Sequence, residues 1–283
     1  MKTLKEALEL ERIELNLFRG FTVRADEPRI FGGQVIAQSL LAAYQTVEGR
    51  LCHSLHAYFI RPGDPTTPIL FEVDRARDGG SFTTRRVTAV QHGRQIFNLA
   101  ASFQASETGP EHQAAMPQVA DADTLDPDQE FQLGPDVPEL LQRLAEERLG
   151  RTSSIEIRSV HPPRPGFTTL KRAPTQQVWM RPREPLPDDP IWHQVILAYA
   201  SDMALLSTSV QPHGLTWDQV FNASLDHGLW FHAPVRFDDW MLYDMDSPSA
   251  RGGRCFNRGA LYSRDGVLVA STAQEGLLRM RKP

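Results

Sequence analysis

Two stretches of the sequence share one pattern: RDGGSFTTRRVTAVQHGRQIFNLAASF (77–103) and ARGGRCFNRGALYSRDGVLVASTAQEG (250–276). Laid over one another without gaps, they are identical at five of 27 positions. The matches include Gly79-Gly80 with Gly252-Gly253, Arg85 with Arg258, and Gly93 with Gly266. Three of the five matches are glycines, which are favoured where a turn restricts the choice of residue. The chain is therefore predicted to contain one structural unit twice.

The same order of elements precedes each stretch. Tyr58-Phe59 and Trp230-Phe231 lie at similar offsets, and each half begins with an apolar segment typical of a helix, at 31–47 and 191–207. The strands are short, rich in aromatic and β-branched residues and joined by tight turns, which indicates antiparallel sheets. One long helix per sheet predicts an α+β fold in which each sheet wraps around its helix.

Composition changes between the halves. The stretch 109–139 is acidic and contains prolines, and proline-rich pieces follow at 161–166 and 181–190. We therefore predict an N-terminal domain over 1–105, a linker and irregular edge segment over 106–175, and a C-terminal domain over 176–283. Within the linker, ELLQRLAEERLG (139–150) predicts a short surface helix.

Composition also narrows the class of protein. The 283 residues carry a net charge of −5 and a pI of about 6.0, which argues against a nucleic-acid-binding protein. The charged N-terminus predicts no signal peptide, and no apolar run is long enough to predict a membrane span. Cys52 and Cys255 are too few for a disulfide framework or a zinc site, so we expect packed thiols and a cytoplasmic location. No nucleotide or metal motif is present, and no cofactor is expected.

A carboxylate interrupts an apolar stripe in the second half. Apolar residues at 191, 195, 198 and 205 would share one face of a helix, and Asp202 falls within that series. The equivalent position in the first half is Ser39. A buried carboxylate costs several kcal/mol unless it is hydrogen-bonded or faces a pocket. Asp202 is therefore a candidate functional residue, unless the stripe is misphased and the side chain lies in solvent.

A second polar residue replaces an apolar one on the last strand of the repeat. Alternation places Phe97, Leu99, Ala101 and Phe103 on a buried face, and Gln274 is the counterpart of Ala101. A buried amide must find partners, either in a site or on a nearby backbone group. Further polar residues lie in NASLDHGLWFHAP (222–234), where a simple turn is an alternative. They are Ser224, Asp226, His227 and His232.

Taken together, these segments resemble the acyl-CoA thioesterase II family. The resemblance rests on FGGQ before an apolar helix, HAYFIRPGD (56–64), ASDMALL (200–206), ASLDHGLWFH (223–232) and STAQEG (271–276). It implies a tandem double hotdog that hydrolyses acyl-CoA. It also implies a catalytic set of aspartate, serine or threonine, and glutamine, which falls on Asp202, Ser224 and Gln274.

Other residues are candidates for substrate binding. Gly32 and Gly33 precede the first helix, where backbone N–H groups and the helix dipole favour a developing oxyanion. His56 belongs to a family motif and shares a strand face with Tyr58 and Ile60, which predicts a packed or substrate-lining role. Arginines on the strands could bind the phosphates of coenzyme A or lie exposed at a strand edge. They are Arg85, Arg86 and Arg258.

Three alternatives to the thioesterase remain at this point. Gly32-Gly33-Gln34 also occurs in translation release factors, although an apolar helix follows here and the chain is acidic. The second is a non-catalytic acyl-CoA-binding protein, and the third is a hotdog hydratase acting on enoyl-CoA. Because hotdog sheets leave an edge open, we expect a homodimer or a larger assembly.

Overall fold

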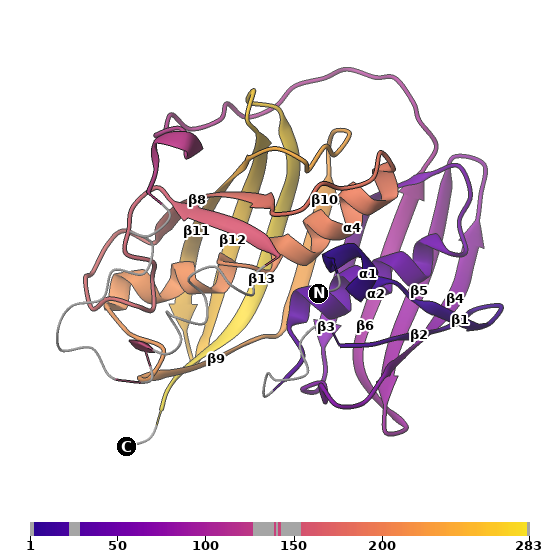
Figure 1. Ribbon diagram of the computed structural model, residues 1–283, viewed down its shortest axis with the longest axis horizontal. Coiled ribbons are helices and arrows are strands. Elements are labelled where there is room, and N and C mark those ends of the chain that lie inside the picture. Colours follow the sequence, from indigo (N-terminus) through magenta and orange to yellow (C-terminus); the bar gives the residue numbers. More distant parts are fainter. Residues whose placement is uncertain (1–2, 23–28, 127–138, 140, 143–153, 282–283) are drawn as a thin grey trace. The chain divides into compact units, whose positions relative to one another are not determined.

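The computed structural model describes residues 3–22, 29–126, 139, 141–142 and 154–281 (Figure 1). They form two compact units that are interleaved along the chain. Unit 1 takes its residues from Met1–His112, Leu186–Met203 and Leu225–Phe237, and unit 2 takes its residues from Gln113–Pro185, Ala204–Ser224 and Asp238–Pro283. Each unit thus draws on both halves of the chain, whereas the sequence analysis placed boundaries at residues 105 and 175.

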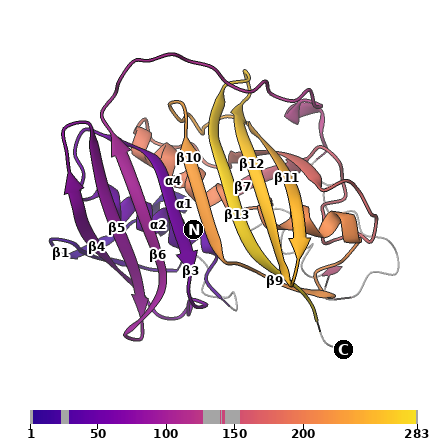
Figure 2. The same ribbon diagram turned by 180° about the vertical axis from the view of Figure 1, so that it is seen from behind.

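Unit 1 contains an antiparallel sheet in the order β1-β2-β4-β5-β6-β3-β10, most of which is seen side by side in Figure 2. Its strands are β1 (Glu11–Glu14), β2 (Leu17–Gly20), β3 (Leu51–Phe59), β4 (Ile69–Asp78), β5 (Phe82–Gln91), β6 (Arg94–Gln104) and β10 (Asp226–Phe231). Its helices are α1 (Leu4–Leu8), α2 (Gly32–Tyr44) and α4 (Pro190–Ser201). The long helices α2 and α4 therefore lie in the same unit.

A buried hydrogen-bond network joins α2, α4 and β3. Tyr44 donates to the Gln194 side chain, Gln194 Nε2 donates to the Cys52 carbonyl at 2.9 Å, and the Cys52 N–H donates to the Tyr44 hydroxyl at 2.7 Å. Every residue of α2 from Gly33 onward is buried, as is every residue of α4 from His193 onward. These helices are thus surrounded by protein on all sides, so a one-sided apolar stripe is a poor description of either.

In unit 2 the strands are antiparallel and follow the order β13-β12-β11-β8-β7, with β9 paired to β13. Its strands are β7 (Ile155–Ser159), β8 (Thr175–Pro182), β9 (Val220–Ser224), β11 (Met241–Arg251), β12 (Arg254–Ser263) and β13 (Leu268–Met280). Its described residues include the 3₁₀ helices η1 (Ala122–Thr124) and η3 (Leu205–His213), and η3 packs against β8, β11, β12 and β13. The strand β7 lies inside the segment predicted as linker, and the helix predicted over 139–150 lies mostly outside the described residues.

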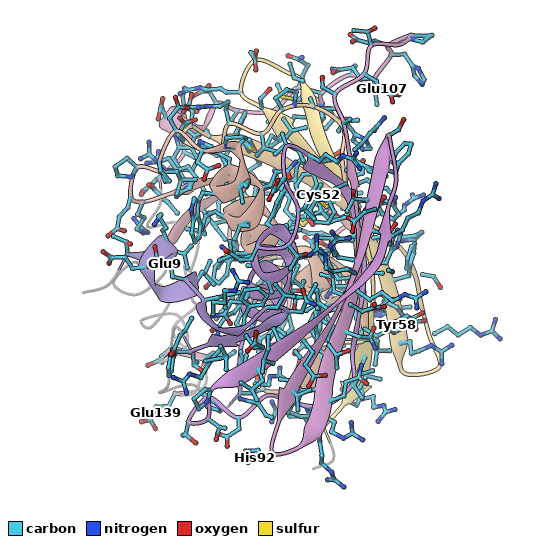
Figure 3. All side chains as sticks on the ribbon, turned by 90° about the vertical axis from the view of Figure 1, so that its right-hand side faces the viewer. Glu9, Cys52, Tyr58, His92, Glu107 and Glu139 are labelled. Carbon is cyan, nitrogen blue, oxygen red and sulfur yellow. The ribbon has the colours of Figure 1, made fainter. Side chains whose placement is uncertain are left out.

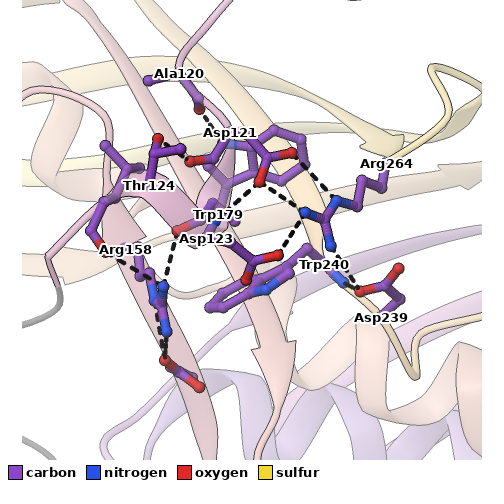
Figure 4. Close-up of polar contacts among 12 residues, drawn as sticks. Ala120, Asp121, Asp123, Thr124, Arg158, Trp179, Asp239, Trp240 and Arg264 are labelled. Carbon is purple, nitrogen blue, oxygen red and sulfur yellow. Dashed lines mark hydrogen bonds and ion pairs between the residues drawn. The ribbon is translucent and has the colours of Figure 1, made fainter.

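The segment before η1 packs on the outer side of the unit 2 strands. The Trp179 indole donates to the Ala120 carbonyl at 2.9 Å, and Trp179 packs with Ala122 and Trp240 in one apolar cluster. Figure 4 shows Arg264 reaching the carboxylates of Asp121 and Asp123. This part of the predicted linker is therefore an ordered cover of unit 2.

The repeated glycines lie in turns, as predicted. His92-Gly93 joins β5 to β6 with φ of 50° and 68°, and Gly252-Gly253 joins β11 to β12 with φ of 62° and 76°. Two successive residues with positive φ are typical of the type I′ hairpin turn, which favours glycine. The prediction that Gly93, Gly252 and Gly253 lie in tight turns is thus confirmed.

The two hairpins that end the repeat differ in register by one residue. In unit 1, Arg85 on β5 lies opposite Ala101 on β6; in unit 2, Asn257 on β12 lies opposite Gln274 on β13. A one-residue slip moves a side chain to the other face of a sheet. Arg85 and Asn257 are accordingly 1% and 0% exposed, whereas the Arg258 side chain is 58% exposed. The alignment of Arg85 with Arg258 was therefore wrong as a structural equivalence.

Among the described residues, no helix is long and apolar enough to cross a membrane.

Candidate functional site

Asp202 lies directly after α4, at its C-cap, and is half-buried. The predicted stripe does not continue through it, because α4 ends at Ser201 and Ala204 adopts a left-handed conformation with φ of 65°. Leu205 begins the separate helix η3 in unit 2. The helix prediction was therefore too long, and Asp202 lies at a helix end instead of within a core stripe.

The Asp202 carboxylate lies beside the N-terminus of α2. A methyl group built on Gly32 would lie 2.6 Å from Asp202 Oδ2. The Ncap residue of α2, Phe31, makes no capping hydrogen bond with its side chain, so it satisfies none of the first backbone N–H groups of the helix. The negative end of α4 and the positive end of α2 thus meet at one carboxylate, which the dipole of α2 stabilises.

Gly33 permits the close approach of the two helices. A methyl group built on Gly33 would lie 2.3 Å from the backbone carbonyl oxygen of Tyr199 in α4. The Phe31 and Tyr199 rings pack edge to face beside it, with centroids 5.1 Å apart. The structure therefore brings Gly32, Gly33 and Asp202 together within unit 1.

We expect Gly32→Ala and Gly33→Ala to have different effects. The new methyl group at 32 would lie 2.6 Å from the end of the flexible Asp202 side chain and 2.9–3.0 Å from the Phe59 ring, so kcat should fall about 10- to 100-fold with a smaller loss of stability than at 33. The methyl group at 33 would meet a backbone carbonyl, so the free energy of unfolding should fall by about 1–3 kcal/mol. Steady-state kinetics and denaturant unfolding of both variants check this. Equal effects of the two variants on stability would contradict it.

A buried pair fixes the end of α4 next to Asp202. Ser201 Oγ donates to the Ala198 carbonyl at 2.9 Å and lies 2.9 Å from His227 Nε2 on β10. Ser201 is 0% exposed and His227 is 1% exposed. Ser201 was not among the predicted site residues, and a simple turn was an alternative for His227. The signal available was its position before Asp202 in ASDMALL.

Ser224 and Gln274 meet in unit 2. Gln274 lies on β13 and is fully buried, and its Nε2 donates to Ser224 Oγ at 2.5 Å. Ser224 is the last residue of β9, opposite Gly276 on β13. A methyl group at Gly276 would lie 2.2 Å from Leu206 Cδ1, so glycine allows η3 to approach there. The buried face predicted for Gln274 is confirmed, and its amide is bonded to the predicted hydroxyl.

Arg85 points into unit 1 and its donors are occupied by protein acceptors. They bind the Thr46 hydroxyl and carbonyl, the carbonyls of Arg77 and Thr84, and the Asp78 carboxylate, all at 2.5–3.0 Å. The guanidinium holds the pKa of the Asp78 carboxyl below its usual value. Burial therefore argues against the expected contact of Arg85 with coenzyme A phosphates.

The other two predicted arginines, Arg86 and Arg258, are exposed. Arg258 forms a bidentate pair with Asp246 at 2.5 and 3.1 Å, and both side chains are exposed. Arg86, the neighbour of Arg85, is exposed as well. Of the three predicted arginines, Arg85 is thus buried in its own unit, whereas Arg86 and Arg258 are exposed in theirs.

His56 lies on the outer face of the unit 1 sheet. Its neighbours on that face, Tyr58 and Ile60, are 60% and 44% exposed, and Figure 3 shows Tyr58 at the surface. The His56 ring packs edge to face against Trp230, with centroids 5.0 Å apart. The inward positions of β3 are Leu55 and Ala57, so His56 packs on Trp230 outside the core, and a substrate-lining role for it stays a prediction.

Two further predictions concern thiols and the Gly-Gly-Gln motif. Cys52 and Cys255 are buried unpaired thiols, as predicted, and burial raises the pKa of each. Gln34 is 2% exposed, and its Nε2 donates to the Phe21 carbonyl at 3.1 Å. A buried glutamine cannot act at the tip of an exposed loop, so the release-factor alternative is wrong.

Solved structures define the class of fold. A protein with hot dog fold from Alicyclobacillus acidocaldarius has a TM-score of 0.76 with 21% identity, over 98% of this chain and 97% of that one. An acyl-CoA thioesterase II from Mycobacterium marinum has a TM-score of 0.77 with 41% identity, over 99% of both chains. The fold is a hotdog fold of the thioesterase type.

Sequence comparisons give the family. Residues 157–277 match the family model described as acyl-CoA thioesterase, and residues 24–104 match the model of an acyl-CoA thioesterase N-terminal domain. Human acyl-coenzyme A thioesterase 8 is 41% identical over 97% of this chain and 88% of its own length. Acyl-CoA thioesterase 2 of Haemophilus influenzae is 37% identical over 99% of this chain and 98% of its own. The chain belongs to the acyl-CoA thioesterase II family, whose enzymes are acyl-CoA thioester hydrolases.

Proposed function

We propose that this enzyme hydrolyses fatty acyl-CoA to a free fatty acid and coenzyme A by direct attack of water. The names of the relatives support the acyl-CoA substrate. The hydrogen bond from Gln274 to Ser224 carries the mechanistic part of the proposal. It fixes a hydroxyl with a fully buried amide, which is the kind of preorganised polar pair that can hold a reacting water.

The proposed reaction is a direct hydrolysis of the thioester bond. Asp202 accepts one proton as the water oxygen bonds to the thioester carbon, while Ser224 and Gln274 orient the water. The backbone N–H groups at Gly32 and Gly33 stabilise the oxyanion. The carbon–sulfur bond then breaks, and the thiolate leaves with its bonding electrons. Its pKa is about 8.5 by analogy with cysteine, so it leaves without a strong general acid and then takes up the proton.

The proposal extends to organisation and location. The shared order of helix and strands supports two hotdogs in tandem, over 1–105 and 176–283, joined by 106–175. We keep the expectation of a homodimer or larger assembly and of a cytoplasmic location as parts of this proposal.

We expect Ser224→Ala and Gln274→Ala each to lower kcat about 10- to 100-fold, and the double variant to lose little more than the worse single one. Residues that hold one water act as a unit, so their effects are not additive. Release of free thiol from saturated acyl-CoA measures turnover, and Gln45→Ala, at an exposed position, is the control. Multiplied losses in the double variant would show that the two residues act independently.

Product analysis separates the alternatives. The thioesterase yields free acid and free thiol from the same substrate. A hydratase would modify enoyl-CoA and leave the thioester intact. A non-catalytic acyl-CoA-binding protein would release no free thiol, whatever the length of the acyl chain.

A further inference from the structure

Asn257 is a third polar residue beside Ser224 and Gln274. It lies on β12 directly opposite Gln274 on β13, and both side chains are 0% exposed. Directly opposite residues point to the same face of a sheet, with Cβ atoms about 5 Å apart. Asn257 therefore faces the same buried space as the Gln274 amide.

The Asn257 side chain is bonded on one side alone. Its Nδ2 donates to Cys255 Sγ at 3.8 Å, and the Cys255 thiol in turn donates to the Gly276 carbonyl at 3.6 Å. Because the Cys255 thiol proton points to the Gly276 carbonyl, the sulfur faces Asn257 as an acceptor. The amide nitrogen of Asn257 therefore points to the sulfur, and its oxygen points the other way. Within the described part of the chain, Asn257 Oδ1 has no hydrogen-bond partner.

An acceptor left without a partner in a protein interior costs about 1–3 kcal/mol. In unit 1, Arg85 holds the corresponding place in its hairpin, opposite Ala101. Its guanidinium is hydrogen-bonded to protein acceptors, so no buried polar group is left without a partner there. Stability alone therefore does not explain an asparagine at 257, where an apolar side chain would remove the orphaned oxygen. Asn257 thus offers an acceptor to a donor from outside the described residues.

We propose that Asn257 Oδ1 accepts a hydrogen bond from the water that attacks the thioester; this rests on the proposed function above. A water has two O–H bonds. One proton passes to Asp202 during attack, and the other stays on the oxygen and becomes part of the carboxylic acid. Asn257 holds that second O–H, which leaves a lone pair of the water for the carbonyl carbon.

Asn257→Val tests this directly, since valine has similar width and no polar atom. We expect kcat to fall about 10- to 100-fold with KM within about twofold, as for loss of a group that orients the reacting water. The thermal midpoint should stay equal or rise, because an unpartnered acceptor is removed. Asn16→Val is the matched control: Asn16 Oδ1 is also buried without a partner among the described residues, but it lies in the β1–β2 turn of unit 1. It should leave kcat unchanged.

Asn257→Asp keeps an oxygen at the same place and should retain kcat within about fivefold of the wild type. It also decides the matter if the valine variant does not fold: a folded aspartate variant as slow as Ser224→Ala overturns the proposal. Wild-type kcat in Asn257→Val overturns it too. If Ser224→Ala is slow at the same time, the proposed function stands without Asn257; if both variants keep wild-type kcat, the proposed function fails as well.

Discussion

Replacement of Asp202 by asparagine should lower kcat about 10²–10⁴-fold, the range found for loss of a positioned general base. Asparagine has the same shape as aspartate, so it keeps the place beside Gly32 and the C-cap of α4. It cannot take up a proton from water. The loss should therefore appear in kcat, with KM close to that of the wild type. Thiol release at saturating acyl-CoA, with denaturant unfolding of the same preparation, measures both quantities.

Asp244→Asn is a matched control for this variant. Asp244 is another half-buried carboxylate, on β11 in unit 2, where it accepts from Gln177 Nε2 at 2.8 Å. An amide oxygen can accept the same bond, so activity should stay near that of the wild type. Unchanged turnover in Asp202→Asn would eliminate Asp202 as the base and would leave the Ser224–Gln274 pair without its proposed proton acceptor.

Alternation along strands was the most reliable guide to the site. Phe97, Leu99 and Ala101 are buried as the period of two predicts, and Gln274 is buried for the same reason. A strand shows one face to the core, so a polar residue in the buried series stands out. The contrast between Ala101 and Gln274 in the two similar stretches of sequence is what made Gln274 a candidate.

The helix reading was less reliable for a physical reason. Because α4 is buried on all sides, the spacing of its apolar residues does not show which face of the helix points to the core. The series of apolar positions that included Asp202 therefore did not mark one face of the helix. Asp202 was identified, but as a residue of a core stripe when it is in fact a C-cap. The chain leaves the helical path at Ala204, which has a left-handed backbone that alanine rarely adopts. No glycine or proline in the sequence there indicated the end of the helix.

A gap-free alignment of the two stretches could not predict which residues pair across the strands. The turns that join β5 to β6 and β12 to β13 differ in length, being His92-Gly93 and residues 264–267. Matching glycines at 93 and 266 therefore conceal the slip that places Asn257, and not Arg258, opposite Gln274. The identity of the two arginines drew attention to Arg258 and away from its neighbour. Cross-strand pairing is a tertiary property, and it had to be seen in the structure.

Replacement of Arg85 by methionine should lower the free energy of unfolding by roughly 2–4 kcal/mol, since hydrogen bonds to a charged group contribute about 1.5–3 kcal/mol each and only part of that loss is recovered by solvent. Methionine fills much of the same space but has no donor. The carbonyls of Thr46, Arg77 and Thr84 would each lose a donor. Denaturant unfolding followed by circular dichroism measures the change.

Arg86→Met is the matched control, because the neighbouring side chain points to the opposite, exposed face of β5. Its effect on stability should stay within about 0.5 kcal/mol. KM for acyl-CoA then distinguishes a structural from a binding role for Arg85. If Arg85 serves the fold, the methionine variant assayed below its unfolding range keeps the wild-type KM. A several-fold rise in KM with unchanged stability would instead support a role for Arg85 in binding coenzyme A. Its side chain would then have to leave Thr46 and Asp78 when substrate binds.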